Sequence, residues 1–198
     1  MTRIVALTGN IAAGKSAVTA VLRARGIPVI DADAIVHELQ RPGTAVFRAI
    51  HARFGDEVVA TDGTLDRAVL RRRVLEDPVA RRDLEAIVHP AVFDRRAALL
   101  AAAAAAATPL VVVDIPLLFE VDDPRHYDAV LLVDAPVAER RRRLIELRGL
   151  DPVEADRLIA LQLPAELKRE RADAIIENDG DLDALAERTD RALATLGA

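Results

Sequence analysis

Residues 8–16, Thr-Gly-Asn-Ile-Ala-Ala-Gly-Lys-Ser, carry the most specific chemical pattern in this chain. They match G-x-x-x-x-G-K-[ST], the spacing of a phosphate-binding loop. Gly9 and Gly14 allow the backbone to approach a ligand closely, so that successive N–H groups from Ile11, Ala12 and Ala13 onward can face anionic oxygens. The pattern also predicts that Lys15 reaches the β- and γ-phosphates and that the Ser16 hydroxyl ligates Mg²⁺.

The segments on either side of this loop favour a functional motif over a glycine turn that matches by chance. An apolar run at residues 4–7 precedes the loop, and a run with helix-forming character at residues 17–22 follows it. A phosphate-binding loop requires this order of strand, loop and helix. The loop therefore predicts binding of a nucleoside triphosphate, but it leaves the reaction open.

Carboxylates follow two other apolar runs. Asp31 and Asp33 come directly after residues 27–30, and Asp114 ends residues 110–113. One of these two carboxylates could take the proton of an acceptor hydroxyl, and either could instead cap the helix that follows. Both roles are possible if Asp31 caps the helix and Asp33 acts as the base. Asp114 has a Walker-B-like position that would hold Mg²⁺, with ordinary strand termination as the alternative.

Two more polar groups are candidates for nucleotide contact. Four consecutive arginines, residues 140–143, would point about 100° apart on a helix, so they cannot all serve one ligand. Most are expected to be solvated or paired with Glu139 and Glu146, and one or two could close over the phosphates. Asn178 and Gly180 follow the last apolar run, where they could form a turn or contact the nucleotide base.

The elements that must position these residues are predicted from five short apolar runs, residues 4–8, 27–30, 110–113, 129–133 and 174–176. Helical patterns separate them, which favours an α/β fold with a parallel sheet and helices on both faces. Ligands gather at the carboxyl ends of such strands, where the polar clusters fall. Residues 44–107 lack a convincing buried strand and predict inserted helices, with a turn at 61–64 and a plain alanine-rich helix ending near residue 108.

The composition further limits the classes of protein to which this chain could belong. The chain has 198 residues, 52% hydrophobic and 30% charged, with a net charge of −5. These values indicate a single soluble α/β domain and give no general basic field for nucleic acid. With no cysteine, disulfides, thiolate metal sites and a cysteine nucleophile are excluded. A strand from residue 3 leaves no room for a signal peptide, and residues 97–107 are too short to span a membrane, so we expect a cytoplasmic protein.

Together these segments resemble the dephospho-CoA kinase family over nearly the whole chain. Besides the loop, the matching elements are Asp31-Ala32-Asp33 with His37-Glu38, Arg41-Pro42-Gly43, residues 63–67 with Leu70-Arg71, Val88-His89-Pro90, residues 115–120 (Ile-Pro-Leu-Leu-Phe-Glu), Gln162, Ala172-Asp173 and Asn178-Asp179-Gly180.

The resemblance implies transfer of the γ-phosphoryl group of ATP to the ribose 3′-hydroxyl of dephospho-CoA, the last step of coenzyme A synthesis. It implies a phosphate-binding-loop NTPase fold with a five-stranded parallel core (residues 1–43, 108–135 and 172–198), a helical CoA-binding insertion (44–107) and a helical lid (136–171). The implied ligands are ATP, Mg²⁺ and dephospho-CoA, with no nucleic acid or membrane partner, in a monomer or small homo-oligomer.

The resemblance also assigns roles to individual residues. Asp33 would be the general base, with Thr8 near the reacting centre and Lys15 and Arg143 on the phosphates. The nucleotide would contact residues 9, 11–16, 143, 178 and 180. The acceptor pocket would be shaped by Asp33, His37, Arg67, Arg71, His89, Pro90 and Leu117.

Two departures from the family pattern concern the nucleotide site. Asn10 and Ala12 stand where the family usually has glycine, and Leu147 replaces a second lid arginine, with Arg148 one place later. The rival hypotheses are a kinase of the same fold with another acceptor, a GTP-binding switch and a non-catalytic ATP-binding protein. Residues 177–180 do not form the Asn-Lys-x-Asp motif that a GTP switch needs.

Overall fold

The structure is a computed structural model that describes residues 1–197. The chain forms two compact units, one made of Met1–Ile30 and the chain from Ala103 onward, the other of Asp31–Ala102. The second unit begins at Asp31, so it includes residues 31–43, which the sequence-based division placed in the core. Within the described part of the chain, no helix has the length and apolar character needed to cross a membrane.

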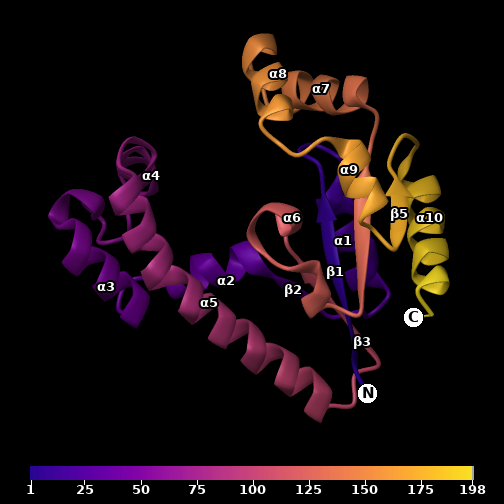
Figure 1. The fold of residues 1–198 in the computed structure, drawn as a ribbon, viewed down its shortest axis with the longest axis horizontal. Helices are drawn as coiled ribbons and strands as arrows, with labels where there is room; N and C mark the ends of the chain where they lie inside the picture. Colours follow the sequence, from indigo (N-terminus) through magenta and orange to yellow (C-terminus); the bar gives the residue numbers. More distant parts are fainter. Residues whose placement is uncertain (198) are drawn as a thin grey trace. The chain divides into compact units, whose positions relative to one another are not determined.

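Five strands in the described residues form the sheet of the first unit (Figure 1). They are β1 (Arg3–Gly9), β2 (Val29–Asp31), β3 (Leu110–Asp114), β4 (Ala129–Asp134) and β5 (Ala174–Glu177), in the order β2-β3-β1-β4-β5. The register is parallel and pairs Leu7 with both Asp114 and Leu131. All five predicted strands are confirmed, and the carboxyl ends of β1, β3, β4 and β5 meet at one edge, as parallel pairing requires.

Helices occupy the intervals between these strands. In the first unit they are α1 (Lys15–Ala24), α6 (Leu118–Val121), α7 (Val137–Glu146), α8 (Pro152–Ala160), α9 (Ala165–Glu170) and α10 (Leu182–Thr195), with a 3₁₀ turn at Pro124–His126. Helix α7, which carries the four consecutive arginines, starts at Val137 with Pro136 as its N-cap.

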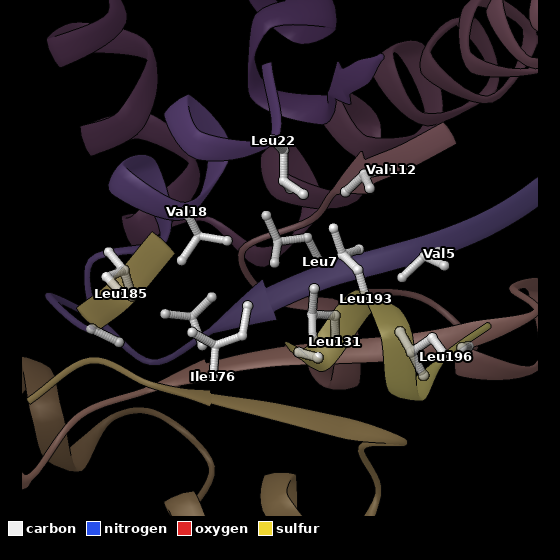
Figure 2. Packing of buried hydrophobic residues seen from close by; sticks show 14 of the residues in the cluster. Val5, Leu7, Val18, Leu22, Val112, Leu131, Ile176, Leu185, Leu193 and Leu196 are labelled. Atoms are coloured by element: carbon white, nitrogen blue, oxygen red, sulfur yellow. The ribbon is translucent and has the colours of Figure 1, made fainter. Parts of the chain in front are cut away.

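The core of the first unit consists of aliphatic side chains between the sheet and two helices (Figure 2). Val5, Leu7 and Leu131 project from the strands, and Val18 and Leu22 from α1 pack against them. Leu185, Leu193 and Leu196, which lie in or just after α10, complete the cluster. Since β1 and α1 are both buried in this core, the loop that joins them is fixed at both ends.

The second unit is helical and has its own core. It contains α2 (Ala32–Leu39), α3 (Ala45–Phe54), a 3₁₀ turn at Asp56–Val58, α4 (Arg67–Glu76) and most of α5 (Pro78–Ala105). Its core includes Phe47, Ile50 and Leu70. A bridge between Val59 and Leu65 closes the predicted turn at 61–64.

The first turn of α2 confirms one of the two roles considered for Asp31. Its carboxylate accepts a hydrogen bond of 2.9 Å from the Ala34 N–H, so Asp31 is the N-cap of this helix.

Pro90 lies inside the 28-residue helix α5, a position that the sequence pattern did not predict. Because proline has no N–H, the carbonyl of Ala86 loses its helical partner there.

Candidate functional site

The backbone of the phosphate-binding loop requires both of its motif glycines. Gly14, the N-cap of α1, has a φ of 90°, and a Cβ added there would lie 2.0 Å from the Asn178 Nδ2. A Cβ on Gly9 would lie 2.8 Å from the Val133 carbonyl oxygen. The backbone of β4 therefore excludes a side chain at position 9, and the left-handed φ together with the Asn178 side chain disfavours one at position 14.

Ala12 also adopts the left-handed conformation, with a φ of 57°. For an alanine this conformation costs about 1 kcal/mol relative to the helical region. The neighbouring Ala13 is buried and donates its N–H to the Asn10 carbonyl at 3.0 Å. The loop thus keeps the sharp turn that a glycine would adopt freely, even though Ala12 carries a side chain.

Side chains from two other elements hold the carbonyl side of the loop. Asn178 donates from Nδ2 to the Ala13 carbonyl at 2.7 Å. Arg143, from α7, donates to the carbonyl oxygens of Ala12 at 3.2 Å, Ala13 at 3.3 Å and Asn178 at 2.9 Å. Since N–H groups of such a loop face the ligand, contacts to its carbonyls leave the phosphate-facing side accessible.

The Asn10 side chain is directed to Asp134 at the end of β4. Its Nδ2 donates to the Asp134 Oδ1 at 2.9 Å, and both residues are buried. The second oxygen of Asp134 accepts a hydrogen bond of 2.9 Å from Arg169. The departure from glycine at position 10 is thus accommodated by the carboxylate at the end of β4.

Gln162 holds the loop at a further point. Its Oε1 accepts the Ile11 N–H at 2.7 Å from the connection between α8 and α9. Sequence reasoning noted Gln162 only as part of the family pattern, and it missed Asp134 and Arg169 as loop supports. The signal available for Asp134 was its position at the end of a buried strand, next to the arginine-rich helix.

The Asp114 carboxylate holds the side chain of Lys15, the lysine of the phosphate-binding motif. The two side chains form a close ion pair, and the Asp114 Oδ2 also accepts a hydrogen bond of 3.2 Å from Thr19 in α1. The carboxylate therefore orients Lys15 at the start of α1, and the exposed Ser16 follows it at the helix N-terminus. Between them, Ser16 and Asp114 provide the oxygen donors that Mg²⁺ prefers.

The segment after β3 is held by the end of β1. Thr8 is buried and donates from Oγ1 to the Pro116 carbonyl at 3.2 Å, while Leu117 is 41% exposed. Thr8 therefore supports this segment through its hydroxyl, and Leu117 presents an apolar side chain to solvent.

The arginines of α7 divide among different partners, as their helical spacing predicts. Arg140 is buried and donates to the Ala135 carbonyl at 3.1 Å, and this burial lowers the pKa of its guanidinium. Arg141 pairs with Asp156, and Arg142 pairs with Glu139 and Glu146.

Arg143 combines its loop contacts with an ion pair to Glu139 at 2.8 Å. The Arg142 and Arg143 guanidinium groups together lower the pKa of the Glu139 carboxyl to about 2. Arg148 is exposed and lies beyond the end of α7.

The remaining candidate residues belong to the helical unit. Asp33 is exposed at the second position of α2, and one turn later His37 contacts Arg67 of α4. Arg67 and Arg71 line one groove on α4 with Ala68, Arg72, Leu75 and Glu76. His89 and Pro90 are exposed on α5. Among residues 1–197, no group of three or more His, Cys, Asp or Glu side chains forms a metal cluster.

The sequence profile described as dephospho-CoA kinase matches residues 3–184. The chain belongs to the dephospho-CoA kinase family. A protein named dephospho-CoA kinase from Anaeromyxobacter dehalogenans is 48% identical over 98% of this chain and 92% of its own length. Another with that name, from Symbiobacterium thermophilum, is 50% identical over 91% of this chain and 76% of its own.

Solved structures with the same fold are also similar to this chain. The protein TT1252 from Thermus thermophilus is 39% identical and superposes with a TM-score of 0.82, covering 98% of this chain and 96% of its own. A shikimate kinase from Bacteroides thetaiotaomicron, 17% identical with a TM-score of 0.53 and 99% coverage of both chains, shares the fold alone. The predicted phosphate-binding-loop α/β fold is confirmed.

The strain at Ala12 predicts a stabilising substitution. Ala12→Gly removes the Cβ from a left-handed residue and should raise the free energy of unfolding by about 1 kcal/mol. Ala20→Gly is the control, because Ala20 is exposed in the interior of α1 and its replacement should lower that free energy by about 1 kcal/mol. Urea unfolding of both variants measures the effect, and a loss of stability in Ala12→Gly would contradict the strain argument.

The Glu139 ion pairs predict a pH-dependent difference in stability. The Glu139 pKa is lowered from its usual 4.5 to about 2, so its stabilising effect is complete above pH 4.5 and is lost as the pH falls toward 2. Glu139→Gln should therefore be less stable than the wild type at pH 7, with a difference that shrinks below pH 4.5. Urea unfolding from pH 7 to pH 3 measures this, and a difference that grows in acid would contradict the assigned cause.

Proposed function

We propose that this protein transfers the γ-phosphoryl group of ATP to the ribose 3′-hydroxyl of dephospho-CoA. The observation that carries the proposal is a phosphate-binding loop in a chain of the dephospho-CoA kinase family. Arg143 and Asn178 hold the loop by hydrogen bonds to its carbonyl groups. Because Ile11 and Ala13 donate their N–H groups to Gln162 and Asn10, the ATP phosphates would bind at the N-terminus of α1.

The donor half uses residues of the first unit. The N–H groups at the N-terminus of α1 and the Lys15 side chain would bind the β- and γ-phosphates, and Asp114 keeps the lysine side chain in place. Mg²⁺, held by Ser16 with Asp114 as a further oxygen donor, would neutralise developing charge on the phosphates. Arg143 would contribute a guanidinium near the phosphates once nucleotide competes with its carbonyl contacts.

The nucleotide base is expected near the turn that contains Asn178 and Gly180. Arg188 fixes this turn through the Glu177 carbonyl, at 2.6 Å, and through the Asp179 carboxylate. Because Asn178 also holds the loop, base binding and phosphate binding would share one support.

The acceptor half would use the helical unit. Asp33 would orient the acceptor hydroxyl and accept its proton, since an exposed carboxylate can act as a general base. Arg67 and Arg71 on α4 supply positive charge for the diphosphate of dephospho-CoA. His37, His89, Pro90 and Leu117 complete the proposed acceptor-binding set.

The second candidate function is phosphoryl transfer to a different acceptor, because a shikimate kinase shares this fold. The elements at residues 63–67 and 88–90 favour dephospho-CoA over nucleoside monophosphates or shikimate. The expected monomer or small homo-oligomer and the expected cytoplasmic location remain predictions.

An acceptor panel tests the proposed function directly. The purified chain is incubated with ATP, Mg²⁺ and, in turn, dephospho-CoA, AMP, CMP and shikimate, and ADP formation is followed with mass analysis of the product. We expect phosphorylation of dephospho-CoA alone, lost when the divalent ion is chelated. Transfer to a nucleoside monophosphate but not to dephospho-CoA would overturn the proposal.

Asp33→Asn tests the proposed base. The kcat with dephospho-CoA should fall about 10²–10⁴-fold while ATP affinity stays close to wild type, because the amide cannot take a proton. Asp183→Asn is the matched control, since Asp183 is likewise the second residue of a helix capped by aspartate. Wild-type turnover in Asp33→Asn would remove this residue from the mechanism.

A further inference from the structure

Lys168 is a fully buried cation outside the residues discussed so far. It lies in α9, its side chain is 0% exposed, and its Nζ is 2.8 Å from the Glu120 Oε1. The contact is an ion pair without the alignment of a hydrogen bond, and within residues 1–197 the ammonium nitrogen has no hydrogen-bond partner. A charge buried in this way needs an explanation, because an apolar pair of similar size is often at least as stable.

The partner of Lys168 belongs to the segment that follows β3. Residues 115–120 leave the sheet at Asp114, which pairs with the phosphate-loop lysine. The Ile115 N–H donates to the Leu7 carbonyl at 2.9 Å, and Thr8 donates to Pro116, so β1 holds the beginning of the segment. Glu120 lies at its far end, and the exposed Leu117 lies between the two attachment points.

A second contact joins α9 to the same end of the segment. The Arg171 guanidinium, at the C-cap of α9, lies over the Phe119 ring at 4.7 Å from its centroid. This cation–π contact and the Lys168–Glu120 ion pair attach adjacent residues of the segment to one helix.

The chain just before α9 reaches the donor loop. Gln162 accepts the Ile11 N–H, and Arg169 pairs with Asp134, which holds Asn10. Residues 162–171 therefore contact the phosphate-binding loop on one side and residues 119–120 on the other. The residues that contact the loop and those that contact residues 119–120 all lie within this ten-residue stretch. The position of α9 therefore affects both sets of contacts.

We propose that Lys168 is a positioning residue for phosphoryl transfer: its ion pair with Glu120 sets the place of residues 116–120 relative to the donor loop. The side chain is buried and touches neither nucleotide nor acceptor in this role. Its effect reaches the substrate through Leu117, so this inference rests on the proposed function, in which Leu117 contacts dephospho-CoA.

The ion pair restricts the position of its two groups more than an apolar pair would. Separating Glu120 from the buried Lys168 leaves the ammonium without a counter-charge, which is strongly unfavourable, whereas aliphatic side chains can pack in several arrangements. Replacing both residues by aliphatic ones should therefore keep the helix packed while allowing residues 116–120 to shift. This separates a positioning role from a purely stabilising one.

The test compares four proteins in steady-state assays and thermal unfolding. They are the wild type, Lys168→Met, the double variant Lys168→Met/Glu120→Leu, and a control double variant Arg25→Met/Asp190→Leu that removes an exposed ion pair between α1 and α10. The KM for dephospho-CoA, the KM for ATP and the kcat are measured for each with Mg²⁺ present.

We expect Lys168→Met and the double variant to unfold at similar temperatures, because the Glu120 side chain is 23% exposed and water can hydrate it when its cation is removed. The KM for dephospho-CoA should rise about tenfold in both variants while the KM for ATP changes less than threefold. The control variant should match the wild type in all three kinetic constants.

A double variant with a wild-type KM for dephospho-CoA would overturn the positioning role, since stability alone would then explain the pair. If Lys168→Met does not fold, Lys168→Arg provides the comparison: a KM for dephospho-CoA closer to the wild type than that of the double variant supports the role, and one equal to it contradicts the role. A wild-type chain that does not phosphorylate dephospho-CoA would instead overturn the proposed function, which the acceptor panel detects separately.

Discussion

The shape of the phosphate-binding loop depends on one steric constraint, the contact between Gly14 and Asn178. The Asn178 side chain occupies the space that a Cβ at position 14 would need, and it donates a hydrogen bond to the Ala13 carbonyl. A left-handed residue at the N-cap of α1 is thereby fixed from outside the loop. Since Ile11 and Ala13 donate their N–H groups within the protein, an anionic ligand would bind at the N-terminus of α1.

Three further residues hold the same short loop from other elements. Arg143 holds the carbonyl groups of Ala12 and Ala13, Gln162 holds the Ile11 N–H, and Asp134 holds the Asn10 side chain. These residues come from α7, the α8–α9 connection and β4. The segment expected to form the lid is thus tied to the donor loop at two points, and α9 extends the connection to Glu120.

Much of the fold could be predicted from the sequence because its signals are local. The five strands are short, largely apolar runs, and the loop motif, the Asp31 cap and the partition of the α7 arginines follow from spacing along one element. The family resemblance depended on such motifs in order, and the match over residues 3–184 bears it out.

The features that sequence reasoning missed depend on residues that are distant in the chain. Asn10 and Asp134 are 124 residues apart, and Ile11 and Gln162 are 151 apart, so no periodic pattern links them. The helical path through Pro90 contradicts local propensity and is set by packing within the second unit. Lys168 is also not predictable locally, since its burial depends on a carboxylate 48 positions earlier in the sequence.

The central claim is that contacts on the carbonyl side of the loop create its phosphate-binding side. It is tested most directly by the affinity of Asn178→Ala for inorganic triphosphate, which has no base or ribose and so reports on the loop alone. Calorimetry should show a dissociation constant about tenfold higher than that of the wild type, because the Ala13 carbonyl loses a buried donor. An unchanged dissociation constant in a folded Asn178→Ala protein would contradict the account.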